Sequence, residues 1–73
     1  MVGPDAQAAA RDLVHRVNER LDEALRAARA AQLRADAGDT DGALAMLQDV
    51  EQPLYEATIL LNAASLLRGS AKP

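Results

Sequence analysis

The sequence predicts an all-α protein built as an antiparallel hairpin of two long helices. Alanine, leucine, arginine and glutamate dominate the 73 residues, which include no Phe or Trp and few β-branched residues. This composition favours helices over strands. Apolar residues recur at alternating intervals of four and three, the spacing of a helix face that packs on another helix. One cluster of turn-forming residues, AGDTDG at 37–42, separates the two helical patterns.

The first helix is expected over about residues 5–37. Asp5 follows Pro4 and can act as the N-cap or as an acid of the first turn. Gly38 can supply the left-handed residue that follows the end of a helix. The predicted packing stripe consists of Ala10, Val14, Val17, Leu21, Ala24, Ala28, Ala31 and Ala35, and Leu13 and Leu25 widen it.

The second helix is expected over about residues 41–68, after a turn at 38–40 and before a tail at 69–73. Asp39 or Thr40 can cap its start. Pro53 lies inside it, where proline removes one backbone hydrogen bond and crowds the preceding turn. We therefore expect a kink or a break near Pro53, and the unbroken phase of the stripe favours the kink. This stripe consists of Ala43, Leu47, Val50, Leu54, Ala57, Leu61 and Ala64.

The two stripes complement each other in size when the chain folds back at the turn. Alanines of the first helix fall opposite Leu47, Val50 and Leu54, and alanines of the second fall opposite Val14 and Leu21. Such alternation of large and small residues allows dense packing. We therefore expect residues 1–73 to form a single hairpin domain, roughly 40 to 50 Å long at the rise of an α-helix.

The second helix has more large apolar residues than one partner helix can cover. A chain of 73 residues without cysteine also buries too little surface to be comfortably stable alone. We expect the hairpin to complete its core by association, most simply as an antiparallel, coiled-coil-like homodimer that forms a four-helix bundle. The expected interface consists of the stripe Tyr55, Ile59, Asn62 and Leu66 together with Leu60 and Leu67.

The charge pattern suggests which partners to expect. Eight Lys and Arg against eleven Asp and Glu give a net charge of -3, which argues against a nucleic-acid partner. Six arginines precede residue 35, interleaved with five acids. These arginines nevertheless suggest an alternative function, that of a homodimeric four-helix-bundle regulatory protein that binds nucleic acid weakly through the arginines of the first helix. That helix has no aromatic residue on which bases could stack.

No catalytic, cofactor-binding or metal-binding residues are expected, so we predict that the protein is not an enzyme. His15 is the only histidine, and no acid or nucleophile is arranged around it. The turn carries Asp39 and Asp41 at calcium-loop spacing, but Ala37 and Gln48 replace the first and last ligands of such a loop. The start MVGPDAQ lacks the pattern of a secretory signal, and no apolar run approaches the roughly 20 residues of a membrane span. We expect a cytoplasmic protein without membrane contact.

Residues 19–67 resemble the small helical-hairpin co-chaperones of type III secretion needle subunits. The resemblance rests on Arg20-Leu21, Ala24-Leu25, Gly38, Leu47-Gln48, Leu54 and Leu60-Leu61. It implies a cytoplasmic hairpin that joins a tetratricopeptide-like chaperone and keeps an aggregation-prone helical subunit in solution. The expected function is thus a small non-catalytic interaction module, such as an adaptor, a chaperone-like subunit or an inhibitor, that binds itself or another helical protein through its apolar C-terminal helix.

Overall fold

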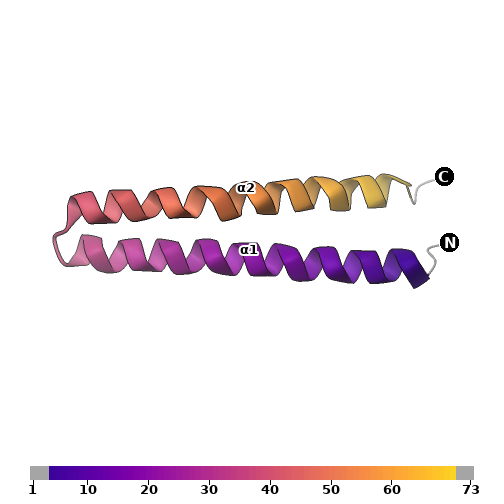
Figure 1. Cartoon of the computed structure of the whole chain (residues 1–73), viewed down its shortest axis with the longest axis horizontal. Helices are drawn as coiled ribbons and strands as arrows, with labels where there is room; N and C mark the ends of the chain where they lie inside the picture. Colours follow the sequence, from indigo (N-terminus) through magenta and orange to yellow (C-terminus); the bar gives the residue numbers. More distant parts are fainter. Residues whose placement is uncertain (1–3, 71–73) are drawn as a thin grey trace.

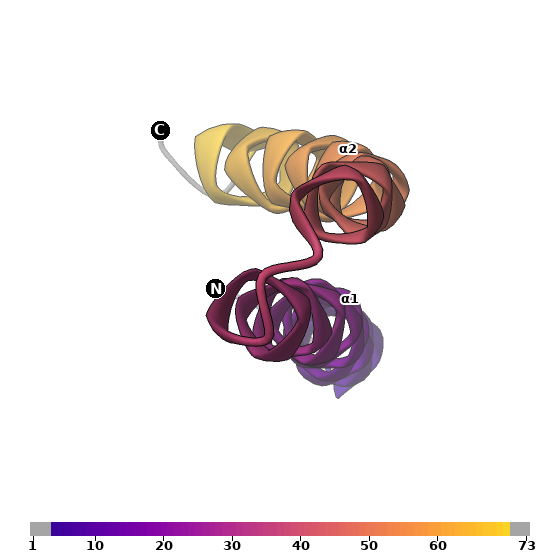
Figure 2. The same ribbon diagram turned by 90° about the vertical axis from the view of Figure 1, so that its left-hand side faces the viewer.

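The structure, a computed structural model, describes residues 4–70 as two long helices that run antiparallel side by side (Figure 1). Helix α1 spans Pro4–Asp36 and helix α2 spans Thr40–Ser70. The described residues include no strand. The hairpin measures 55 × 16 × 12 Å, somewhat longer than expected. The end-on view shows that the helices are not strictly parallel, because their far ends lean in opposite directions (Figure 2). The predicted all-α hairpin is confirmed.

The turn between the helices is closed by two backbone hydrogen bonds. The Gly38 N–H donates to the Ala35 carbonyl at 3.0 Å, and the Asp39 N–H donates to the Arg34 carbonyl at 2.9 Å. This pair of bonds is the Schellman motif, which needs a left-handed residue directly after the helix. Gly38 has φ +83°, and its lack of a Cβ makes that conformation accessible without strain. The left-handed role predicted for Gly38 is confirmed.

Asp39 caps the start of α2. Its Oδ1 accepts a hydrogen bond from the Gly42 N–H at 2.9 Å, and its carbonyl accepts the first helical bond from the Ala43 N–H at 2.9 Å. Gly42 makes room for this arrangement, since a Cβ at that position would collide with the Asp39 carboxylate. The cap predicted at Asp39 or Thr40 is thus at Asp39.

The outer ends of the helices and the region of Pro53 differ in part from expectation. Helix α1 begins at Pro4, a favourable first position because its nitrogen has no hydrogen to satisfy, and Asp5 lies in the first turn as expected. Helix α2 continues through Pro53 and through Gly69 to Ser70, so the break considered at Pro53 is absent. The loss of one helical hydrogen bond does not end the helix there. The expected kink stays a prediction, and residues 71–73 of the tail lie outside the described residues.

The core between the helices is narrow and consists mainly of small residues. Ala24, Ala31, Ala43 and Ala57 are the buried hydrophobic residues of the described chain, and no large side chain is fully buried. Pro53 is also buried. Small residues on the line of contact let two helix backbones approach closely.

About half of the residues predicted in each packing stripe do not face the other helix, so this part of the prediction is wrong. Val14, Leu21, Leu47, Leu54 and Leu61 were expected in the core but are exposed. The observed stripes keep the 4-3 spacing. At every second position, however, the residue that faces the other helix comes one place earlier in the sequence than predicted, which corresponds to a rotation of about 100° around the helix axis. The observed stripes are Leu13, Val17, Arg20, Ala24, Ala27 and Ala31 in α1, and Ala43, Met46, Val50, Pro53, Ala57, Leu60 and Ala64 in α2.

Candidate interaction surfaces

One broad side of the hairpin carries large apolar side chains from both helices. We call this surface the leucine face. Its side chains are between 44% and 61% exposed, although the sequence pattern assigned nearly all of them to the core of the hairpin. The leucine face consists of Val14, Leu21 and Leu25 of α1 and of Leu47, Leu54 and Leu61 of α2.

Helix geometry explains why these residues share one side. Val14 and Leu21 each follow a packed position by one residue, which turns them about 100° away from the line of contact. Leu54 and Leu61 are turned by the same amount from the packed positions before them. Because the helices are antiparallel, equal rotations in the same sense bring both sets to the same side of the pair. The side chains therefore form one surface instead of two separate stripes.

The register of the helices arranges the leucine face in layers. The Arg20 Nη1 atom lies 3.7 Å from Glu56 Oε1 across the pair, which fixes the level of these two residues. Counting helical turns from this contact in both directions gives three levels, about 10 Å apart. Val14 is level with Leu61, Leu21 with Leu54, and Ala28 with Leu47.

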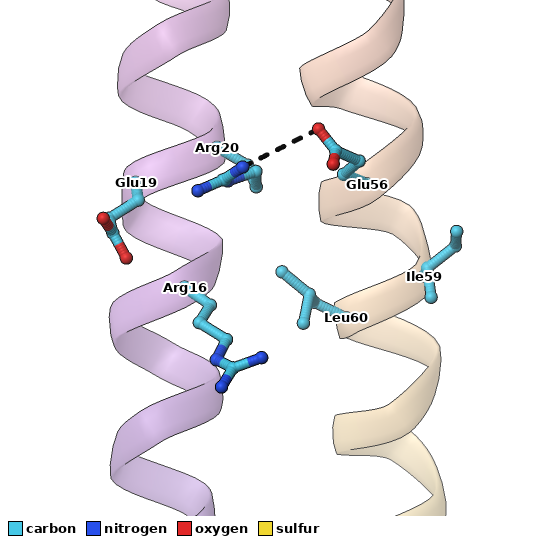
Figure 3. Close-up of a pocket in the computed structure, with 6 residues that line it drawn as sticks. All are labelled: Arg16, Glu19, Arg20, Glu56, Ile59 and Leu60. Carbon is cyan, nitrogen blue, oxygen red and sulfur yellow. Dashed lines mark ion pairs between the residues drawn. The ribbon is translucent and has the colours of Figure 1, made fainter.

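The opposite broad side is charged. Figure 3 shows the side chains of Arg20 and Glu56 extending toward each other between the helices, with Arg16 and Leu60 beside them. These residues border an open depression of about 490 Å³, with Glu19 and Ile59 at its edges. Arg20 also lies 3.5 Å from Glu23 within α1. Burying this side under an apolar partner would remove these charges from water at considerable cost.

The six residues predicted as an interface fall into two groups. Tyr55, Ile59, Asn62 and Leu66 lie on the side of α2 that faces away from α1, and all four are exposed. We call this set the outer stripe. Leu60 instead points toward α1 (Figure 3) and is half-buried. Leu67, which is 37% exposed, lies on the same side of α2 as Leu60.

The arginines of α1 are largely compensated by neighbouring acids. Arg11 and Arg29 are the two arginines of α1 without an ion pair to any described residue. A nucleic-acid partner would have to displace acids that lie within a few ångströms of the other four. Those four pairs are Arg16 with Asp12 at 2.9 Å, Arg20 with Glu23 at 3.5 Å, Arg26 with Asp22 at 2.9 Å and Arg34 with Asp39 at 3.1 Å.

His15 and Asp39 are the side chains to consider for catalysis and for metal binding. No group of three or more His, Asp or Glu side chains among residues 4–70 is placed to hold a metal ion. The exposed His15 Nε2 lies 3.4 Å from Glu19 Oε1, one turn later on α1. Asp39, one of the two acids at calcium-loop spacing, is engaged as the cap of α2. Over the same residues, neither helix has a stretch apolar and long enough to cross a bilayer.

Comparison with family models, with curated proteins and with solved structures finds no match to this chain. The two apolar surfaces and the charge pattern are therefore the basis for a functional proposal. The sequence pattern had indicated the residues of the outer stripe. It missed the leucine face, and the signal that could have found it was Leu25, which widens the apolar side of α1 beyond one stripe.

Proposed function

We propose that this protein is a small non-catalytic protein–protein interaction module that binds a helix of another protein along the outer stripe. The observation that carries the proposal is the exposure of the outer stripe, three of whose four residues are large and apolar, on the side of α2 that faces away from α1. Tyr55 is 63% exposed and Ile59 49%. A stripe with 4-3-4 spacing is the surface on which an amphipathic helix packs.

The energetics of exposure support a partner for this surface. Complete burial of a side chain of the size of Ile or Tyr is worth about 1.5 to 3 kcal/mol relative to water. Isolated exposed apolar residues are common, whereas contiguous ones mark interaction surfaces. Residues of the outer stripe recur on every turn of the C-terminal half of α2, so they form a contiguous patch.

The charge of α2 indicates the chemistry of the partner. Four acids (Asp41, Asp49, Glu51 and Glu56) and one arginine (Arg68) give this helix a net charge of -3. A partner helix with lysine or arginine beside its apolar stripe would match this charge, which favours rapid and specific association. Together with the resemblance to secretion co-chaperones, this favours an adaptor or chaperone-like role. Assembly into a four-helix bundle would use the leucine face and does not depend on this partner.

Site-specific photo-cross-linking in the native cell tests the proposal. A photoreactive amino acid at Ile59 should cross-link to a discrete protein, whereas the same group at Arg11 on the polar side of α1 should not. The cross-linked protein, identified by mass spectrometry and purified, can then be titrated with variants of this chain. We expect Ile59→Glu to weaken binding about tenfold or more, because it places a charge in the apolar contact.

Gln7→Glu is the matched control, because it adds the same charge at an exposed position of α1, away from the outer stripe. It should change the affinity by no more than about twofold, the usual effect of a solvated charge. Glu56→Lys is less suitable as a control, since Glu56 faces Arg20 across the hairpin. Equal affinity of the Ile59→Glu variant and the wild type would refute binding through the outer stripe.

A further inference from the structure

We propose that the leucine face is covered by a second copy of this chain, and that the two hairpins form a four-helix bundle with both turns at the same end. This inference concerns a different surface from the outer stripe and goes beyond the proposed function. It follows from the size of the broad side that carries this face, from the internal symmetry of the face and from the charge of the two helices.

The broad side that carries the leucine face in its middle has the size of a stable interface. The hairpin is 55 Å long and 16 Å wide, so one broad side offers on the order of 900 Å², similar to what each partner contributes to a standard protein–protein interface. The other broad side carries the Arg20–Glu56 pair and is unsuited to an apolar contact. A partner that buries one broad side should therefore choose the leucine face.

A second copy fits this face because its layers are self-complementary. Rotation about a two-fold axis parallel to the helices lays α1 of one copy on α2 of the other. This rotation does not change the position of any residue along the axis, so residues that are level within one copy are also level between the copies. Val14 then meets Leu61 of the second copy, Leu21 meets Leu54, and Ala28 meets Leu47. Every layer thus combines residues of both helices from both copies, as in the interior of a four-helix bundle.

The net charges of the helices favour this arrangement over a dimer whose two-fold axis is perpendicular to the helices. Helix α1 has six arginines and six acids and is formally neutral, whereas α2 carries a net charge of -3. With both turns at the same end, each α2 lies on a neutral α1. A two-fold axis perpendicular to the helices would put the turns at opposite ends and stack α2 on α2, which places two like-charged helices side by side. Like charges at such an interface oppose association.

Sedimentation equilibrium of the purified chain gives the first test. The wild type should be a dimer at micromolar concentration, and Leu54→Glu should raise the dissociation constant about 100-fold or more, because each copy would bury a carboxylate in the apolar layer. Leu33→Glu is the matched control. Leu33 is 72% exposed and lies on the side of α1 that faces away from α2, so dimerisation should persist. A wild-type monomer at 100 μM, roughly the upper limit for a specific contact of this size, would overturn the proposal.

The test also separates the leucine face from the outer stripe. If Ile59→Glu dissociated the dimer and Leu54→Glu did not, the proposal that the leucine face forms the contact between the copies would be refuted. If the wild type is a monomer, binding of another protein through Ile59 is unaffected, so failure of the dimer and failure of the proposed function are distinguishable.

A distance measurement on an otherwise wild-type chain tests the arrangement and does not depend on whether Leu54→Glu folds. The chain has no cysteine, so Ala37→Cys, at an exposed position next to the turn, places one spin label on each copy. Turns at the same end predict a label separation of about 20 to 30 Å, the width of a helical bundle. A separation of about 50 Å, the value for turns at opposite ends, would refute the arrangement.

Discussion

At the scale of single residues, Asp39 joins the two helices. Its N–H closes the end of α1, its carboxylate caps α2, and Arg34 lies 3.1 Å from the same carboxylate. The hydrogen bond from the Gly42 amide lowers the pKa of Asp39 below its ordinary value of 3.8, and Arg34 lowers it further. The ionised form of Asp39 is therefore favoured in the folded protein.

This lowered pKa predicts a specific dependence of stability on pH. A carboxyl whose pKa is lower in the folded state stabilises the protein fully above its unfolded pKa, about 3.9 for Asp, and this contribution is lost as the pH falls through the lower folded value. Asp39→Asn keeps the cap, because asparagine caps helices as well as aspartate, but it cannot titrate. The difference in melting temperature between wild type and Asp39→Asn should therefore shrink or reverse as the pH falls below about 4.

Thermal unfolding followed by circular dichroism across this pH range checks the prediction. Asp39→Ala removes the cap itself and should lower the melting temperature at every pH. Asp41→Asn removes an acid from the first turn of α2 that is not the cap, and serves as the charge control. A difference between wild type and Asp39→Asn that does not vary with pH would contradict the role of the charge.

At the scale of the helices, alanines determine how α1 and α2 pack. Ala57 is 2% exposed and Ala31 4%, and both lie on the line where the helices meet. Leucines that follow this line by one residue are turned about 100° away from it, to one side of the hairpin. The line of contact thus buries small side chains, whereas its leucines are only half-buried.

Enlarging one of these alanines tests the close approach of the helices. Ala57→Leu should destabilise the protein by about 1 to 3 kcal/mol, the usual cost of extra methylene groups in a filled space. Ala45→Leu adds the same group at an exposed position of α2 and should change the stability by less than about 0.5 kcal/mol. Chemical denaturation of the two variants measures the difference. If both variants were equally stable, the helices would not be as closely packed as described.

At the scale of the whole molecule, the proposed dimer predicts a contact between Arg29 and Glu51. Both side chains are exposed, have no ion pair within residues 4–70 and border the leucine face. With both turns at the same end, Arg29 of one copy lies about one helical turn from Glu51 of the other along the bundle. The other two-fold arrangement does not bring these residues together.

Charge reversal at these positions provides a test of the contact. Arg29→Glu and Glu51→Arg should each weaken dimerisation about two- to fivefold at low salt, and the double variant should recover most of the loss. The effect should decrease at high ionic strength because the contact is exposed. Sedimentation equilibrium at two salt concentrations measures all four proteins. Independent effects of the two substitutions would argue against this contact.

The sequence by itself determined the elements of this protein. The helix formers, the single turn cluster and the 4-3 spacing specify two helices, and Gly38 and Asp39 could be assigned from local rules because their roles depend on neighbours in the chain. Tyr55, Ile59 and Leu66 could be recognised for a similar reason, since they lie opposite any stripe that faces α1.

Only the tertiary structure decided which part of each apolar stripe faces the partner helix. A 4-3 stripe is broader than the contact between two helices, so spacing alone permits more than one rotation of each helix about its axis. The burial of Pro53 and the half-burial of Arg20 and Leu60, in place of Leu54, Leu21 and Leu61, show which rotation the helices adopt. Leu21, Leu54 and Leu61 then lie on one side of the hairpin, because each follows by one residue a position that faces the other helix and is turned about 100° from it.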